Sequence, residues 1–181
     1  QWPLHIHVSE QPAENQACVA AYGMTPTELL GATGVLSGRT TAVHATHLTA
    51  HDIELLGSTR TFSCFCPTTE RDLADGIGPA TALAAAGSPL CLGSDQHAVI
   101  DLLEEARALE VHERLETNQR GRIQPADIVT ALTVAGDLPS GLSFVDNGDG
   151  TATLEGTLVY ESGCAETVTN SAGQQVQGSP G

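Results

Sequence analysis

The sequence predicts an α/β fold with a parallel sheet, because strand-like apolar runs alternate with helical patterns along residues 1–135. Each run is short and rich in Val, Leu, Ile or Thr, and a segment with helix-start signals follows it. Three of the four predicted strands also end in side chains suited to acid, base or metal-ligand chemistry, the expected arrangement at the carboxyl ends of parallel strands. These ends lie within residues 5–10, 43–47 and 93–97.

The first half of this unit is predicted to hold two strands and three helices. Pro12 suits the first position of a helix, and Gly23 is expected to end that helix. Thr25 and Glu28 have the spacing of a capping box, in which two side chains satisfy the free N–H groups at a helix start. The expected elements are strand 4–8, helix 12–20, helix 26–30, strand 40–44 and a helix capped by Thr49 that contains Ile53, Leu55 and Leu56.

The second half repeats the alternation of strands and helices. Strand 60–65 ends before Pro67 and leads into a polar loop, and a small-residue helix over residues 79–86 precedes strand 90–93. The longest helix is expected over residues 99–115. Its apolar residues fall at three- and four-residue steps: Ile100, Leu103, Ala106 and Leu109.

The composition changes near Ala135, which predicts a second domain over residues 136–181. This segment has no His or Arg, six carboxylates, and much Gly, Thr and Ser. Two alternating segments flank the turn 146–150, whose Asn and Gly residues tolerate the positive φ angles of a hairpin. We expect a small β domain whose last residues, from 174 onward, are frayed.

Composition also restricts the partners of the chain. It has 22 acidic and 7 basic residues, a net charge of −15, which repels nucleic acid and anionic membranes. No run approaches the ~18 apolar residues of a membrane helix. Five cysteines without a Cys-x-x-Cys pair fit buried free thiols in a reducing compartment, so a cytoplasmic protein is expected. The abrupt start at Gln1 allows for a missing upstream segment.

The strand ends carry the candidate chemistry. His5 and His7 share one face of a strand, so one of them is expected to bind a metal while the other orients substrate or packs. Glu10 follows where the chain leaves the strand, a position suited to a proton shuttle. His44 ends the next strand, and Asp95 follows the fourth, where a carboxylate completes a metal site and accepts a proton from water.

Each of these residues has a structural alternative. A lone His in a strand more often packs in a core, and an Asp after Gly-Ser suits a turn or a helix N-cap. Their occurrence together, at the ends of three separate strands, favours a shared site. A zinc ion there lowers the pKa of its bound water to about 7.

These motifs resemble the amidohydrolase superfamily and, within it, the formimidoylglutamate deiminases. The resemblance covers residues 3–135, and Cys66-Pro-Thr-Thr-Glu70 begins its most discriminating stretch. It implies a partial (β/α)₈ TIM barrel made of strands five to eight. It also implies a small-molecule substrate and hydrolysis of N-formimidoyl-L-glutamate to N-formyl-L-glutamate and ammonia in histidine degradation. The segments that carry it are 9–15, 43–47, 66–77 and 93–98.

The resemblance also implies a role for each matched residue. His7 and Asp95 become ligands of one divalent metal, zinc or alternatively iron, and Asp95 is also the first base on the water. Glu10 becomes the acid/base, and His44 steadies the tetrahedral intermediate. Four more positions fall near the pocket as substrate-binding residues: His5, Glu70, Arg71 and His97.

Two departures from the pattern matter. Gln96 stands where the pattern has Ser, and nothing here supplies the metal-binding His-x-His pair of the first strand. His5 and His7 do not replace that pair, because their spacing from His44 and Asp95 fits the fifth strand. The chain is therefore predicted to be half a barrel with an incomplete ligand set, inactive alone, and prone to pair with a missing N-terminal half or with itself.

The tail resembles bacterial immunoglobulin-like repeats over residues 138–173, which implies a structural or adhesive β fragment. Asp146 and Asp149 suggest calcium, but the turn lacks the ligands of a calcium loop. Two alternatives to the formimidoylglutamate reaction stay open. One is a surface-protein fragment with an inert barrel piece, and the other is an amidohydrolase deaminase acting on a guanine-like substrate.

Overall fold

The computed structural model describes residues 2–96 and 99–134, together with four short strands in the tail. Contacts divide the chain into two compact units, Gln1–Ala135 and Gly136–Gly181, and each is described by itself. The elements of the first unit are, in order, β1 (Leu4–Val8), α1 (Pro12–Tyr22), α2 (Pro26–Ala32), β2 (Thr40–His44), α3 (Ala50–Ser58), β3 (Phe62–Phe65), α4 (Pro67–Asp72), α5 (Ala80–Ala86), β4 (Leu90–Leu92), α6 (Leu102–Thr117) and α7 (Pro125–Val134).

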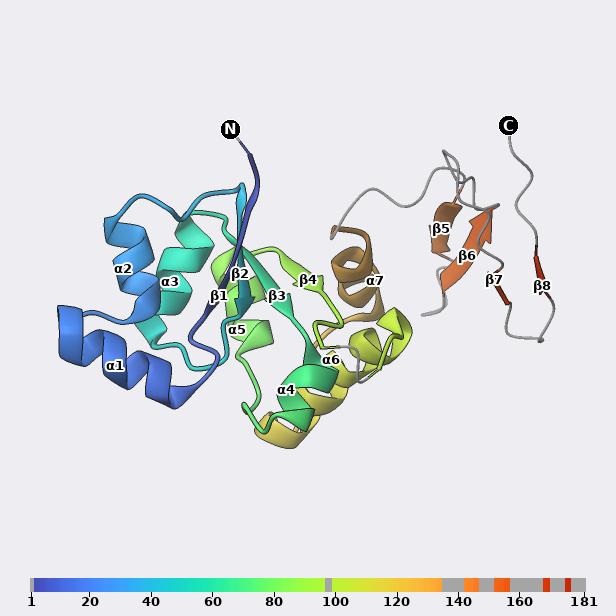
Figure 1. Cartoon of the computed structure of the whole chain (residues 1–181). Coiled ribbons are helices and arrows are strands. Elements are labelled where there is room, and N and C mark those ends of the chain that lie inside the picture. The colour runs from blue at the N-terminus through green and yellow to red at the C-terminus, as the bar shows by residue number, and fades with distance from the viewer. Residues whose placement is uncertain are drawn as a thin grey trace. The chain divides into compact units, whose positions relative to one another are not determined.

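The four strands form one parallel sheet in the order β1-β2-β3-β4, which confirms the predicted α/β class. Parallel strands need crossover connections, and the helices between them provide these. Their carboxyl ends share one edge, toward the bottom of Figure 1, where β3 runs into α4. In register across the sheet lie His7, Val43, Cys64 and Cys91.

One face of the sheet packs against helices to form the core. Val8, Ala42 and Phe65 from the strands are buried there with Leu56 of α3 and Leu83 of α5. Side chains alternate between faces in a strand, so the residues in register with His7 lie on the opposite face. Helices α1, α2 and α3 lie beside β1 and β2, whereas α6 and α7 lie beyond β4 (Figure 1).

Three helices differ from the sequence prediction. Helix α4 occupies the segment expected to be a polar loop, and α7 lies where no element was predicted. The longest helix begins at Leu102 and not at residue 99, because the Asp101 side chain caps the N–H groups of Leu103 and Glu104. Of its expected apolar face, Ala106 and Leu109 are buried, but Ile100 precedes the helix and Leu103 is 70% exposed.

A buried carboxylate joins α2 and α3. Asp52 accepts hydrogen bonds from Thr25 Oγ1 at 2.5 Å and from the N–H and hydroxyl of Thr49, both at 2.8 Å. It completes the capping box of α3 and is fully buried. One side chain therefore satisfies a helix start and fixes a neighbouring helix.

Replacing Asp52 with alanine is expected to lower the free energy of unfolding by about 2 kcal/mol, because a cap is lost and buried donors are left without an acceptor. Urea unfolding followed by circular dichroism measures the change. Glu54→Ala, which removes an exposed carboxylate from the same helix, is the matched control and is expected to change little. Equal unfolding midpoints for the two variants would contradict this role of Asp52.

In the second unit, β5 (Leu142–Asp146) pairs antiparallel with β6 (Ala152–Gly156), as the sequence predicts. A second antiparallel pair joins β7 (Val168–Thr169) and β8 (Gln175–Val176). The immunoglobulin-like assignment of this unit stays a prediction. Of the helices in the described residues, none has the length and apolarity that crossing a membrane requires.

Candidate metal centre

The structure brings four predicted site residues together at the carboxyl edge of the sheet. His7 Nε2 lies 3.9 Å from Asp95 Oδ1, and His44 Nε2 lies 3.8 Å from Asp95 Oδ2. Glu10 Oε1 lies 3.6 Å from the same His44 nitrogen. Residues 88 positions apart in the chain thus share one site because the strands before them are parallel neighbours.

The backbone turns sharply where these residues leave their strands. Ser9, His44, Ala45 and Asp95 all have positive φ angles, of 53°, 67°, 47° and 50°. Such conformations cost of order 1–3 kcal/mol each in non-glycine residues and persist only where surrounding contacts enforce them. One such contact is the hydrogen bond from Ala45 N–H to the Val8 carbonyl at 3.1 Å, which holds the end of β2 against β1.

A buried glutamate fixes the His44 ring. His44 is fully buried, and its Nδ1 lies 3.3 Å from Oε1 of Glu70, which is itself 2% exposed. The same Glu70 oxygen accepts the backbone N–H of Cys66 at 2.8 Å. This contact favours a proton on His44 Nδ1, which leaves the Nε2 lone pair facing Glu10 and Asp95.

The titration of this pair follows from its surroundings. Burial alone would lower the pKa of His44, but the hydrogen bond with Glu70 and the nearby carboxylates of Glu10 and Asp95 outweigh it and raise the pKa. Burial also raises the pKa of Glu70, against the opposing effect of its hydrogen bonds with His44 and Cys66. Both shifts favour keeping a proton within the His44–Glu70 pair.

The donor atoms fit a metal ion. Within the described residues, the ligand atoms of His7, His44 and Asp95 all lie within 4.8 Å of one another. His44 Nε2 is buried and makes no hydrogen bond among these residues, although it faces two carboxylates. A cation between these groups would bind the Nε2 lone pair and the two carboxylates that it faces. Imidazole and carboxylate are both ligands that zinc accepts. The sequence assigned two ligands to this chain, and the structure adds His44 Nε2 as a third donor.

The other predicted residues lie in different surroundings. His5 is exposed on the same face as His7. Glu70 is turned toward His44, whereas the half-exposed Arg71 lies 3.7 Å from Glu104 of α6. His97 lies outside the described residues.

Sequence reasoning missed the residue that positions Glu10. Glu14, in the first turn of α1, accepts the backbone N–H groups of Ser9 and Glu10 at 2.9 and 3.0 Å. It therefore holds the segment that leaves β1 and carries the Glu10 side chain. An acidic residue in the first turn of a helix was the available signal, because such residues often bond to the free N–H groups there.

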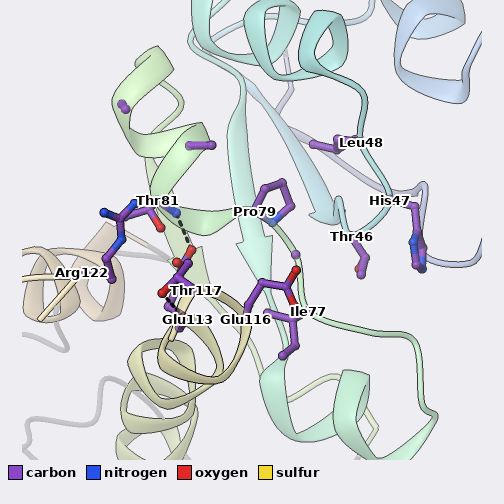
Figure 2. Close-up of a pocket in the computed structure, with 13 residues that line it drawn as sticks. Thr46, His47, Leu48, Ile77, Pro79, Thr81, Glu113, Glu116, Thr117 and Arg122 are labelled. Carbon is purple, nitrogen blue, oxygen red and sulfur yellow. Dashed lines mark hydrogen bonds between the residues drawn. The ribbon is translucent and has the colours of Figure 1, made fainter. Parts of the chain in front are cut away.

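A separate hollow of ≈ 490 Å³ lies away from this cluster. Figure 2 shows Thr46 and His47, which follow β2, on one side of it, and Glu113 of α6 bonded to the N–H of Thr81 in α5 on the other. The residues that line it do not include the four of the candidate metal centre. The candidate chemistry therefore lies at the strand ends and not in this hollow.

Residues 1–138 match the Amidohydrolase family. The chain belongs to the amidohydrolase family. It is 35% identical to a 5-methylthioadenosine/S-adenosylhomocysteine deaminase of Pelotomaculum thermopropionicum, over 78% of this chain and 34% of that protein. It is 36% identical to the formimidoylglutamate deiminase of Pseudomonas aeruginosa, over 69% of this chain and 28% of that protein. This amidohydrolase chain therefore spans about a third or less of the length of these relatives.

Solved amidohydrolase structures share the fold of the first unit. An amidohydrolase from Brucella melitensis superposes with a TM-score of 0.69 at 32% identity, over 72% of this chain and 30% of that one. An adenosine deaminase from Xanthomonas campestris, solved with bound zinc, gives a TM-score of 0.66 at 30% identity, over 72% and 32%. The fold and the family are thus shown for the first unit.

Proposed function

We propose that this chain supplies the carboxyl-terminal half, strands five to eight, of the barrel of a metal-dependent hydrolytic deaminase. The proposal rests on one observation above all: the ligand atoms of His7, His44 and Asp95 gather at one point, with the Glu10 carboxylate beside them. A solved relative with bound zinc favours zinc over iron, whereas the donor set of two imidazoles and one carboxylate suits either ion. When bound, zinc lowers the pKa of a water to about 7 and so makes a nucleophile available near neutral pH.

The residues of this chain have distinct parts in the proposed reaction. His7 and Asp95 would hold the metal, and His44 completes a three-donor set while the other half of the barrel is absent. In the full barrel, where that half would supply further ligands, the Nε2 lone pair of His44 is free to accept a hydrogen bond from the hydroxyl group of the tetrahedral intermediate. Glu70 keeps the His44 ring in place through Nδ1.

Proton transfer is assigned to Glu10, with Asp95 as the first base. The Glu10 side chain is 26% exposed, so it has access to the substrate side of the site. As the water oxygen adds to the formimidoyl carbon, a carboxylate takes the water proton. Glu10 delivers this proton to the formimidoyl nitrogen. As the carbonyl then forms, the remaining hydroxyl proton passes through a carboxylate to the same nitrogen, the C–N bond breaks, and ammonia leaves with N-formyl-L-glutamate as the other product.

N-formimidoyl-L-glutamate is the favoured substrate, because the segment that begins Cys66-Pro-Thr-Thr-Glu70 resembles the deiminases of that compound and one relative carries that name. A purine-type substrate is the second candidate, since an 8-oxoguanine deaminase of Pseudomonas aeruginosa is 37% identical over 59% of this chain. Both compounds present an amidine-like carbon bonded to a leaving nitrogen, so the same acid/base groups serve either one.

The test combines this chain with a separately expressed first half of a homologous barrel. Ammonia release is measured with N-formimidoyl-L-glutamate, 8-oxoguanine and 5-methylthioadenosine, and zinc content is measured in parallel. Release from the first compound alone supports the proposed substrate, and release from a purine alone supports the second candidate. No ammonia from any of them, in a pair that contains zinc, would reject the deaminase proposal.

The pH dependence of zinc binding is a further prediction. The pKa of His44 is raised from 6.5, so the Nε2 atom holds a proton below that raised value, and zinc must displace it. Affinity is expected to fall by about tenfold per pH unit for each displaced proton as the pH drops through this range. Competition with a coloured chelator, repeated at several pH values, measures the zinc affinity of this chain alone.

The control for this prediction is a histidine outside the cluster. His44→Asn is expected to reduce the slope by one proton, whereas His51→Asn, an exposed side chain on α3, is expected to leave it unchanged. Circular dichroism checks that both variants fold. An unaltered slope in folded His44→Asn would remove His44 from the set of zinc donors.

The second unit carries no step of this reaction. A structural or adhesive role, as in immunoglobulin-like repeats, is the proposal that its sequence favours, and a cytoplasmic location of the enzyme unit is likewise carried forward as a prediction. A pull-down with the separately expressed residues 136–181 against the first unit tests whether the two act together.

A further inference from the structure

The turn after α4 contacts two of the loops that carry the candidate site. Asp75, within this turn, accepts a hydrogen bond from the Gln11 side chain through Oδ1 at 2.7 Å. Its carbonyl oxygen accepts a second one from Nε2–H of His47 at 2.6 Å. Gln11 directly follows Glu10, and His47 comes three positions after His44. Asp75 therefore joins the loop after β1 to the loop after β2.

The backbone of the turn sets the place of Asp75. Ala74 has a positive φ of 59°, and the chain folds back there, so that the Asp75 N–H bonds to the Glu70 carbonyl at 2.9 Å. The Glu70 side chain itself lies against His44. One short segment therefore holds both the His44 ring and the loop that carries Glu10.

The same segment also contacts the loop after β4. The Thr69 hydroxyl of α4 donates to the carbonyl of Ser94 at 2.9 Å, and Ser94 directly precedes Asp95. Helix α4 and the turn after it thus bond to all three strand-end loops of the candidate metal centre. Functional groups supported by one common element keep fixed separations, which acid/base chemistry requires.

Two further bonds make the order of the Glu10 loop measurable. The His47 N–H donates to the Ser9 carbonyl at 2.9 Å, and the Asn15 side chain donates to the His47 carbonyl at 2.6 Å. The N–H groups of Ser9 and Glu10 bond to the Glu14 carboxylate. Displacement of this loop is therefore expected to expose three backbone N–H groups, those of Ser9, Glu10 and His47.

Fold stability does not account for a carboxylate at position 75. Asp75 is 3% exposed, and its Oδ2 atom has no hydrogen-bond partner among the described residues. A buried carboxylate oxygen without a partner lowers the stability of a fold. Its other oxygen meets Gln11, an exposed side chain whose burial contributes little. The contact is explained if it serves the position of Glu10.

We propose that Asp75 is a positioning residue for proton transfer, which acts through Gln11 to hold the loop that carries Glu10. It does not touch the substrate itself. This inference rests on the proposed role of Glu10 as the proton carrier. A shift of about 1 Å caused far from the reacting atoms can cost about 100-fold in rate, so the place of this loop matters for catalysis.

The experiment reverses the direction of the hydrogen bond. Gln11→Glu places a second carboxylate against that of Asp75, so the two groups repel each other and the loop is expected to move. Adding Asp75→Asn restores a donor and an acceptor, with the amide donor now at position 75. Gln16→Glu makes the same chemical change at an exposed residue of α1 and is the matched control.

Hydrogen exchange followed by NMR tests the contact in this 181-residue chain alone, without any activity. In Gln11→Glu the amides of Ser9, Glu10 and His47 are expected to exchange at least about 10-fold faster, because a bond to a charged group is lost. The double variant is expected to restore their protection. The amide of Thr61, bonded within the turn before β3, is the internal reference for global stability and is expected to stay unchanged.

Activity of the reconstituted enzyme tests the role in proton transfer. Gln11→Glu is expected to lower kcat by about 10-fold to 100-fold while KM and zinc content stay nearly the same. The double variant is expected to recover most of this loss, and Gln16→Glu is expected to change none of these quantities. A merely structural role would reduce the amount of folded, zinc-containing enzyme and not kcat per bound zinc.

Three results would overturn the proposal: unchanged exchange in Gln11→Glu, faster exchange that Asp75→Asn does not repair, and full kcat in a variant whose loop is displaced. Gln11→Ala, which removes the donor without adding charge, is expected to change exchange in the same direction and replaces Gln11→Glu if that variant fails to fold. No ammonia from the reconstituted parent would reject the deaminase, and with it the part of Asp75 in proton transfer. The exchange data would still decide whether Asp75 holds this loop.

Discussion

Replacing Glu10 with glutamine is expected to lower kcat of the reconstituted deaminase by about 100-fold to 10,000-fold, the usual contribution of a positioned acid/base group. The amide keeps the size of the side chain and its place beside His44, but it cannot take a proton from water or return one to the leaving nitrogen. Glu10 lies 3.6 Å from His44 Nε2 and is outside the three-donor set, so zinc content is expected to stay the same.

Ammonia release under saturating substrate measures the effect, and zinc analysis of the same preparation shows that the metal is retained. Glu54→Gln is the matched control, because it removes an exposed carboxylate from α3, and it is expected to leave kcat unchanged. If Glu10→Gln lost zinc in proportion to activity, Glu10 would be a ligand and not a proton shuttle. If it kept full activity, the proton would have to travel through Asp95 alone.

The strands of the first unit could be predicted because local pattern and tertiary role agree. Residues 4–8 and 40–44 are short apolar or β-branched runs, and the structure has strands with these same bounds. Helices α2 and α3 carry complete capping boxes at Thr25 and Thr49, so the local sequence also predicts where these helices begin. Each of these elements needs only near neighbours to be recognised.

Helix α4 could not be predicted in the same way, since long-range contacts stabilise it. Its first turn contains Thr68 and Thr69, which are poor helix formers. The N–H and hydroxyl of Thr68 bond to Glu105, a fully buried carboxylate of α6, and the Thr69 hydroxyl bonds to the Ser94 carbonyl at 2.9 Å. A polar segment becomes a buried helix because partners far along the chain satisfy it.

In the candidate site, too, some features follow from the local sequence and others depend on long-range contacts. The positions of His7, His44 and Asp95 at strand ends follow from the βα alternation, and the parallel sheet then places them at one edge. The direction of the Glu70 side chain does not follow from it, because that depends on α4. Sequence resemblance named Glu70 as a substrate contact, but its bond to His44 and its 2% exposure favour a positioning role.

Two substitutions at Glu70 are therefore expected to differ. Glu70→Ala removes the acceptor for both His44 Nδ1–H and the Cys66 N–H, so it is expected to lower kcat/KM by about 10-fold to 100-fold, the range for residues that orient a functional imidazole. Glu70→Gln keeps an oxygen acceptor and is expected to retain most of the activity. Recovery by the isosteric residue would show that orientation of the ring is what Glu70 provides.

The pH profile separates this positioning role from a merely structural one. The Glu70 carboxylate helps to raise the pKa of His44, so Glu70→Gln is expected to lower that pKa. Activity that requires neutral His44 is lost as the pH falls through its pKa, and the acid limb of kcat/KM should therefore move to lower pH in Glu70→Gln. Glu113→Gln is the matched control, because Glu113 is also buried and accepts a backbone N–H, that of Thr81, outside the site. It is expected to leave the acid limb in place, and an equal shift in both variants would mean that the limb reports general stability and not the charge beside His44.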